Sequence, residues 1–201
     1  EAACCLGNKK RAIADRFSEI IQTMLDHGLN LHHPHYIGHQ VPAPSPIAGL
    51  FDSVGAVTNQ VMAVYEMGPW ATATEVALIN RFGGIIGWEK DTFSGLITHG
   101  GSLANLTALL TARNVRLGDS WEEGIPCRSE NERPVVVVHS DVHYSVSRAV
   151  GVLGIGARQV SRAVLDARRR IDPQRLDEQL ANFRRRGQPV VAVVACACAT
   201  P

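Results

Sequence analysis

The pattern of apolar and polar residues is clearest between residues 95 and 117. Residues 95–98 form a short apolar run that favours a strand, and Gly100 and Gly101 follow as a tight turn. Ser102 is expected as the N-cap of the next helix. In that helix leucines recur every three or four residues with polar residues between them: Leu103, Leu106, Leu109, Leu110 and Leu117. The pattern therefore predicts strand, glycine turn and helix in direct succession.

The N-terminal third is predicted to be helical on both sides of a proline-rich segment. Residues 9–29 place apolar side chains on one face of a helix that ends at Gly28. Helical patterns follow over residues 46–67 and 73–82, and a Gly-Pro pair separates them.

The segment between the first two helices must be a loop, because it contains prolines at positions 34, 42, 44 and 46. It also carries four histidines: His32, His33, His35 and His39. Their spacing fits no regular metal pattern, and no cysteine or acidic partner lies nearby. We therefore expect this loop to line a pocket or an interface, and we expect no metal site.

Beyond residue 117, strands and helices alternate. The expected elements are strands at 134–139, 158–162 and 189–196 and helices at 145–153 and 173–186. The first and last strands are apolar on both faces, which is typical of strands buried in a parallel sheet. The alternation predicts an α/β fold with a mostly parallel sheet.

Polar clusters follow the predicted strands at residues 98–102, 139–143 and 199–200. In parallel sheets ligands bind at the carboxyl ends of the strands. We therefore expect these three clusters to meet at one edge of the sheet and to form a site.

The glycine turn before residue 102 is a candidate anion site. Glycines allow close approach, and a helix N-terminus carries partial positive charge, so phosphate is its commonest occupant. A plain turn between strand and helix explains the same residues equally well. A Walker loop is excluded because no lysine follows the glycines, and a dinucleotide fingerprint is not expected at Gly154 and Gly156, because the third glycine is absent.

A hydrolase is the alternative interpretation of the same turn. Residues 100–104 resemble the G-x-S-x-G nucleophile elbow with alanine in the last place, which makes Ser102 the candidate nucleophile. Asp141 and His143 follow in the order that a catalytic triad requires. They lie only two residues apart, however, whereas a triad normally takes its acid and its base from separate loops.

Composition narrows the class of protein. The formal net charge of +1 gives no case for nucleic-acid binding. No apolar run approaches the roughly 20 residues of a membrane span. The five cysteines are odd in number and lack zinc-type pairing, which favours free thiols in a reducing compartment, so a cytoplasmic protein is expected.

Five segments, in the same order, resemble the group II pyridoxal-phosphate-dependent amino-acid decarboxylases, which include the glutamate, aromatic amino-acid, diaminobutyrate and sulfinoalanine enzymes. THGGSLANLTALLTAR is similar to their phosphate-binding segment, and HSDVHYSVSRAVGVLG to the segment whose histidine stacks on the cofactor. HPHYIGHQVPAPSP resembles their substrate loop, and YEMGPWATATEVALINRFGGIIG the helices after it. RIDPQRLDEQL and the last strand complete the series.

The resemblance implies the N-terminal part of a fold type I large domain, similar to that of aspartate aminotransferase. Residues 1–45 would be the N-terminal helix with the substrate or interface loop, and residues 46–201 the first part of the cofactor-binding domain. The implied reaction converts an L-amino acid to its amine and carbon dioxide with pyridoxal 5'-phosphate as cofactor.

The resemblance also implies roles for single residues. Gly101, Ser102 and Leu103 would bind the cofactor phosphate, and Thr200 would lie near the phosphate and the ring oxygen. His143 would be the catalytic, ring-stacking histidine. His39 and Gln40 would lie on the substrate side.

One family feature is missing from these 201 residues. The family's Schiff-base lysine and the aspartate at its pyridine nitrogen come after the position of Thr200, whereas the lysines here are Lys9, Lys10 and Lys90. We therefore expect either a complementary C-terminal chain that carries this lysine or a truncated sequence, and a non-catalytic remnant is the third alternative. The expected assembly is a homodimer or a dimer of heterodimers, without nucleic acid or membrane.

Overall fold

The computed structural model describes residues 2–38, 41–125, 129 and 132–197, without side chains for residues 2–10. Contacts divide the chain into two units, Glu1–Thr74 and Glu75–Pro201. Each unit is described by itself below. In the described part of the chain, no helix combines the length and the apolar character needed to cross a bilayer.

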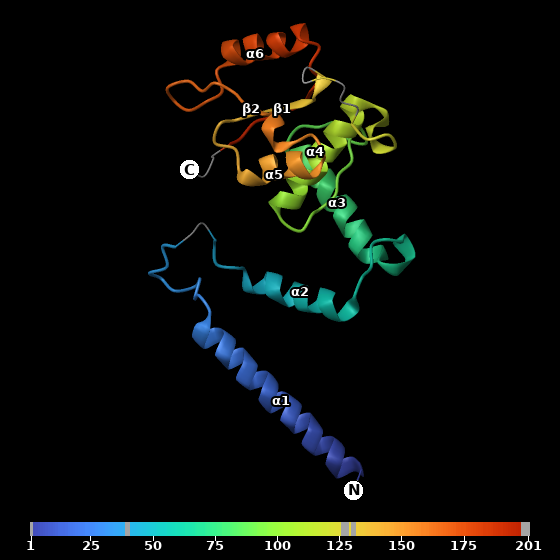
Figure 1. Cartoon of the computed structure of the whole chain (residues 1–201). Coiled ribbons are helices and arrows are strands. Elements are labelled where there is room, and N and C mark those ends of the chain that lie inside the picture. The colour runs from blue at the N-terminus through green and yellow to red at the C-terminus, as the bar shows by residue number, and fades with distance from the viewer. Residues whose placement is uncertain (1, 39–40, 126–128, 130–131, 198–201) are drawn as a thin grey trace. The chain divides into compact units, whose positions relative to one another are not determined.

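The first unit is helical (Figure 1). Its elements are α1 (Ala2–His27), α2 (Pro46–Thr58), η1 (Tyr65–Met67) and the beginning of α3 (Pro69–Ile85). The helix predicted over 46–67 is too long, because α2 ends at Thr58. Asn59 takes the left-handed conformation there, with φ of 46°, and its N–H donates to the carbonyl of Gly55. This C-cap closes the helix before the apolar pattern ends.

Apolar side chains of the first unit are mostly exposed. The face of α1 that the periodicity identified includes Phe17 and Leu25, which are 64% and 71% exposed. Helix α2 has no buried residue. Among residues 11–38 and 41–74, Gly68 alone is buried. The described part of this unit therefore builds no hydrophobic core around α1 or α2.

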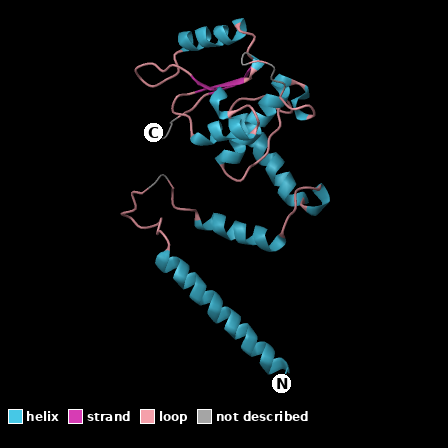
Figure 2. Cartoon of the chain, viewed as in Figure 1, coloured by secondary structure: helices cyan, strands magenta, loops and turns pink. Residues whose placement is uncertain are grey.

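The second unit contains all the described strands, which lie after residue 134 (Figure 2). Besides the end of α3, its elements are α4 (Gly101–Leu117), η2 (Asp119–Trp121), β1 (Val135–Val138), α5 (Tyr144–Val152), η4 (Ala157–Gln159), β2 (Val160–Arg162), α6 (Pro173–Arg185) and β3 (Val190–Val194). The strands form one parallel sheet in the order β2-β1-β3. These elements confirm the α/β prediction and shift most of its boundaries by one or two residues.

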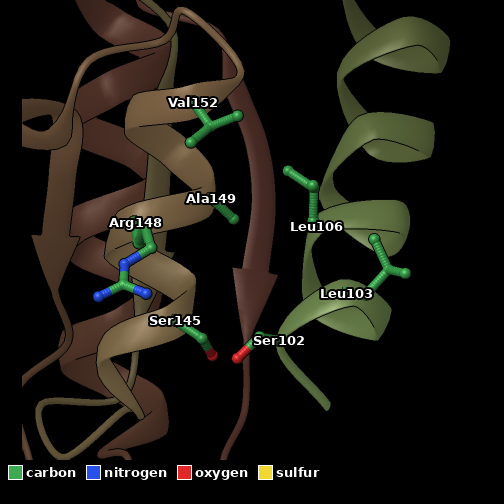
Figure 3. Close-up of a pocket in the computed structure, with 7 residues that line it drawn as sticks. All are labelled: Ser102, Leu103, Leu106, Ser145, Arg148, Ala149 and Val152. Carbon is green, nitrogen blue, oxygen red and sulfur yellow. The ribbon is translucent and has the colours of Figure 1, made fainter. Parts of the chain in front are cut away.

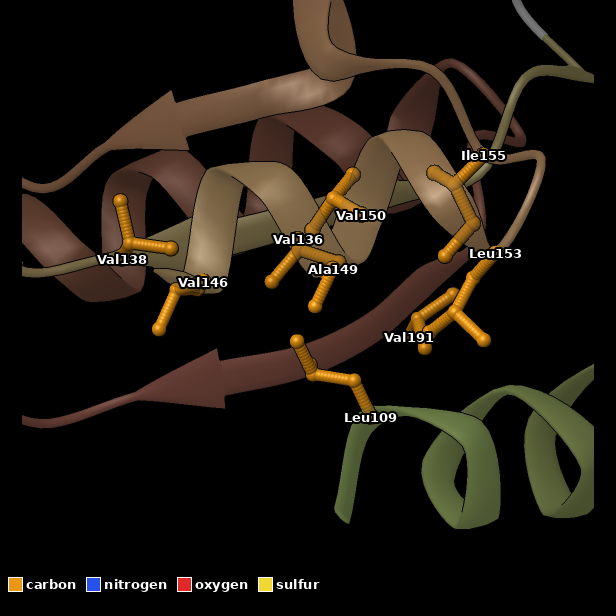
Figure 4. Close-up of a cluster of buried hydrophobic side chains, with 9 residues drawn as sticks. All are labelled: Leu109, Val136, Val138, Val146, Ala149, Val150, Leu153, Ile155 and Val191. Carbon is orange, nitrogen blue, oxygen red and sulfur yellow. The ribbon is translucent and has the colours of Figure 1, made fainter. Parts of the chain in front are cut away.

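Strand β1 is the centre of the core. Its four valines are between 0% and 3% exposed, because β2 and β3 flank it and helices cover it. Figure 4 shows α4 and α5 contributing side chains to the same cluster. The cluster consists of Leu109, Val136, Val138, Val146, Ala149, Val150, Leu153, Ile155 and Val191. The core thus packs α4 and α5 against one sheet.

The strand predicted over residues 95–98 is wrong. A strand needs partner backbone, and the described sheet ends at β2 on one side and β3 on the other. The N–H of Ile97 donates instead to Oε1 of Glu75 on α3, at 2.7 Å. Leu96 and Ile97 are 55% and 50% exposed, so this apolar run is not buried as the pattern predicted.

Candidate functional site

The carboxyl end of β1 leads directly to the polar residues predicted to form a site. Residues 139–143 follow this strand, and the N–H of His139 donates to the carbonyl of Val194 at the end of β3, at 3.0 Å. Because the strands are parallel, their carboxyl ends share one edge of the sheet. The third predicted cluster, residues 199–200, lies outside the described residues.

The prediction that Ser102 is the N-cap of α4 is wrong, because the helix begins at Gly101, two residues before the start that such a cap would give. Gly100 is the N-cap, with φ of 86° and ψ of 156°, and helical geometry starts at Gly101. This backbone conformation is essentially restricted to glycine, which explains why the boundary falls there. Ser102 therefore lies inside the first turn, where its N–H group is one of the helix's free donors.

The start of α4 has the properties of an anion cradle. Among the described residues, none accepts a hydrogen bond from the N–H groups of Gly101, Ser102 or Leu103, and no side chain caps the helix. A Cβ added to Gly100 or Gly101 would meet no atom within 4 Å. Free donors, open space and the positive end of the helix dipole suit a phosphate group.

A pocket of about 200 Å³ lies between α4 and α5. Figure 3 shows Ser102 and Ser145 pointing toward each other from the two helices, with Arg148 on α5 nearby. The rest of the lining is apolar: Leu103, Leu106, Ala149 and Val152. The two serines thus lie near the beginning of the two helices, and Arg148 lies in the middle of α5.

His143 stands at the N-terminus of α5 as its N-cap. The N–H of Ser145 donates to the ring Nδ1 at 3.2 Å, and Oγ of Ser145 lies 2.8 Å from the same nitrogen. The ring centroid is 4.3 Å from that of Tyr144, and the guanidinium of Arg148 lies over the Tyr144 ring at 4.8 Å. His143 is an exposed side chain that α5 holds in a defined place.

The hydrolase triad is not assembled. Asp141 accepts a hydrogen bond from Nε of Arg169 at 3.0 Å and pairs with its guanidinium, while His143 bonds Ser145. Ser102 occupies an ordinary helical turn, whereas a nucleophile elbow places its serine on a strained turn. None of these contacts joins the three residues that the alternative requires.

A second pocket, of about 470 Å³, lies beyond the carboxyl ends of β1 and β3. It is lined by His139, Arg168, Arg169, Arg170, Ile171, Ala195 and Cys196. Two of its three arginines are already paired, Arg169 with Asp141 and Arg170 with Asp166. This pocket is therefore less cationic than its sequence suggests.

Four of the seven residues predicted for the site lie in the described part of the chain. Gly101, Ser102 and Leu103 form the first turn of α4, and His143 is the N-cap of α5. His39, Gln40 and Thr200 lie outside the described residues. Sequence reasoning missed Asn105, Ser145 and Arg148. The spacing of Ser145, Arg148, Ala149 and Val152 along one helical face was the signal that could have identified the pocket wall.

Comparison with known proteins gives one consistent result. The family model described as the pyridoxal-dependent decarboxylase conserved domain matches residues 7–201. An aromatic-L-amino-acid decarboxylase of Bacillus atrophaeus is 32% identical over 169 residues, which are 84% of this chain and 33% of that protein. An L-2,4-diaminobutyrate decarboxylase of Acinetobacter baumannii is 24% identical over 199 residues, 94% of this chain and 39% of that protein.

Solved structures show the same fold over part of their length. Mouse CSAD matches with a TM-score of 0.79 and 22% identity, over 89% of this chain and 36% of that one. The glutamate decarboxylase domain of a Vibrio parahaemolyticus protein matches with a TM-score of 0.80 and 23% identity. This match covers 90% of this chain and 40% of that one. The chain spans between about a third and two fifths of the length of these four relatives. Its α/β fold is that part of a fold type I enzyme, and the chain belongs to the pyridoxal-dependent decarboxylase family.

Proposed function

We propose that this chain is part of an enzyme that converts an L-amino acid to its amine and carbon dioxide with pyridoxal 5'-phosphate. The observation that carries the proposal is the juxtaposition of two helix beginnings. Ser102, which follows the open glycine turn of α4, and Ser145 on α5 line one pocket, and Ser145 also contacts His143 at the start of α5. Family membership supplies the cofactor class.

The start of α4 would hold the cofactor phosphate. The N–H groups of Gly101, Ser102 and Leu103 are the donors, and the hydroxyl of Ser102 adds one more. Thr200 is the further phosphate-side residue in this proposal. An anchored phosphate keeps the cofactor from sliding along the edge of the sheet.

His143 would lie against the cofactor ring. When bound, the cofactor supplies an electron sink for the bond to the substrate's α-carboxylate, and that bond must stand perpendicular to the ring plane for the electrons to enter. A flat imidazole at the start of a rigid helix holds such a plane, and positioning of this kind provides much of an enzyme's rate. His39 and Gln40 complete the proposal on the substrate side.

The remaining parts of the enzyme would come from elsewhere. The lysine that binds the cofactor covalently and the acid at the pyridine nitrogen are assigned to a C-terminal region, either a complementary chain or the rest of a longer one. Residues 46–201 would then be the first part of the cofactor-binding domain, and residues 1–45 would contact substrate or a partner subunit. Two such units would form a homodimer or a dimer of heterodimers.

Introducing a negative charge at the start of α4 tests this proposal. In the complete protein, Ser102→Asp places a carboxylate where the phosphate would bind, so cofactor retention should be lost, as measured by visible absorbance. Ser147→Ala is the control, because Ser147 lies on α5 and does not line the pocket. The proposal would be overturned in favour of a hydrolase if the wild-type protein contained no cofactor and had an esterase activity that Ser102→Ala abolished.

A further inference from the structure

A chain of hydrogen bonds from Asn105 through Ser145 ends at Nδ1 of the His143 ring. We propose that Asn105 and Ser145 form a relay that holds the proton of the neutral His143 ring on Nε2, which makes Asn105 a positioning residue. The relay itself follows from contacts within this chain. Only its use in catalysis rests on the proposed function.

The relay crosses from one helix to the other. Asn105 lies on α4, and its Nδ2 donates to Oγ of Ser145 on α5, at 2.9 Å. The Ser145 Oγ lies 2.8 Å from Nδ1 of His143, and the backbone N–H of Ser145 donates to that same nitrogen at 3.2 Å. Two groups of one serine therefore converge on a single ring atom.

The direction of the bonds follows from which atoms carry hydrogen. An amide NH₂ can only donate, so Oγ of Ser145 accepts from Asn105 and its own hydrogen is free to point at His143. A backbone N–H also only donates. Nδ1 must therefore present its lone pair, because a proton there would face the N–H of Ser145. In the neutral ring the proton then resides on Nε2.

Burial makes the relay rigid. Ser145 is 3% exposed and Asn105 is half-buried, so water competes little for their hydrogen bonds. His143 itself is exposed, and among the described residues its Nε2 has no hydrogen-bond partner. The ring atom Nδ1 is thus bonded to Ser145, whereas the Nε2–H group is left to donate to a ligand.

His139 provides the contrast within the same loop. Its Nδ1 accepts from the N–H of Asp141 at 3.1 Å, and its Nε2 donates to the carbonyl of Arg169 at 2.9 Å. Both nitrogens are used by the protein, and the side chain is 6% exposed. His139 is therefore a structural histidine. His143 has the same proton arrangement but keeps Nε2–H available.

Helix α4 would then contribute to the site in two ways. Its first turn offers donors to an anion, and Asn105, one turn later, directs the proton of His143. An Nε2–H group can donate to an anionic oxygen, such as the carboxylate of an amino-acid substrate. The same helix would thus set the position of the phosphate and the hydrogen-bonding sense of the ring.

Reversing one bond tests the relay. Asn105→Asp can still bond Ser145, but its carboxylate accepts the serine hydrogen and so turns the relay around. Asn105→Ala removes the bond. The readout is the ¹⁵N spectrum of histidine-labelled complete protein, free of cofactor, at about pH 9, above the range in which histidines ordinarily titrate. We expect Nε2–H in the wild type and in Ser147→Ala, and a measurable Nδ1–H population in Asn105→Asp.

Activity and stability separate positioning from simple packing. At saturating cofactor, Asn105→Asp should lower kcat about tenfold while the unfolding temperature stays near wild type, because the side chain can still bond Ser145. A purely structural link predicts that Asn105→Asp behaves like the wild type and that only Asn105→Ala loses stability. That result, or a wild-type ring protonated on Nδ1, would overturn the relay.

The two proposals can fail separately. If the tautomer shifts as expected in Asn105→Asp but the complete protein binds no cofactor, the relay is supported and the decarboxylase proposal falls. If cofactor binds and decarboxylation occurs, but the tautomer of His143 is the same in Asn105→Asp as in the wild type, the decarboxylase proposal is supported and the relay is wrong.

Discussion

Residues 1–74 and residues 75–201 both contain amphipathic helices, yet they use them differently. In the second unit α4 and α5 bury their apolar faces against β1, whose valines are at most 3% exposed. In the first unit Phe17 on α1 is 64% exposed, and α2 buries no residue. Periodicity identifies an apolar face in both units, but it does not say what covers that face. Among the described side chains, those of the second unit bury the apolar faces of its own helices, and those of the first unit do not.

The largest expected effect comes from charging the core of the second unit. Val136→Asp would bury an unpaired carboxylate at a fully buried position, at a cost of several kcal/mol against a typical domain stability of about 5–15 kcal/mol. The sheet should not fold, as measured by circular dichroism and thermal unfolding. Phe17→Asp is the matched comparison and should leave the sheet intact. Equal damage from both variants would contradict the distinction between the units.

Phe17→Asp should instead weaken assembly. If a partner subunit covers α1, as proposed, the change removes the burial of one aromatic side chain, worth about 2 kcal/mol or roughly 30-fold in Kd. Sedimentation of the complete protein over a range of concentrations would show the shift to smaller species. An unchanged association constant would mean that the exposed face of α1 is not the contact with a partner.

The site in the second unit should depend on the shape of the His143 ring. His143→Ala should lower kcat by about 100-fold and weaken cofactor binding, because positioning is lost. His143→Phe keeps a flat ring and should retain more of the binding than of the turnover. Unchanged decarboxylation in His143→Ala, measured on the complete protein, would refute the stacking assignment.

The smallest expected effect concerns an exposed turn of the second unit. Backbone and side-chain hydrogen bonds from Arg170, with another from the N–H of Arg168, hold the pKa of Asp166 below its ordinary value. Its stabilising contribution is therefore present above the unfolded pKa of about 3.9 and is lost as pH falls through the lower folded value. Asp166→Asn should lower the unfolding temperature slightly at pH 7. The difference should shrink as pH falls below about 4, and a difference that does not change with pH would contradict this account.

Sequence reasoning succeeded where local pattern and burial agree. The valine run at 135–138 has no polar face, so a central parallel strand was the natural prediction, and Asp172 followed by Pro173 marked the start of α6. It failed at residues 95–98, because a strand depends on partner backbone that a local pattern does not reveal. It also misplaced the start of α4, which the φ of Gly100 decides.

The sequence indicated single residues of the candidate site but not the hydrogen bonds that connect them. Glycines before a helix and a histidine after a buried strand are visible in the sequence. The bond from Asn105 to Ser145 joins residues that are 40 positions apart, and nothing in the spacing of either helix indicates it. The rotation of α4 relative to α5 determines this contact, and packing against the sheet sets that rotation.

The parallel order of the sheet also has consequences for how the chain folds. In the ladder Val136 lies beside Val160 and Ala192, 24 and 56 positions later in the chain. Neither pair can form as a hairpin, so loop closure must precede each gain in strand pairing, and such topologies fold slowly. During that interval the run of four valines is exposed, and short β-branched segments without charge are prone to intermolecular pairing. The strand at the centre of the finished unit is thus also an aggregation risk during folding.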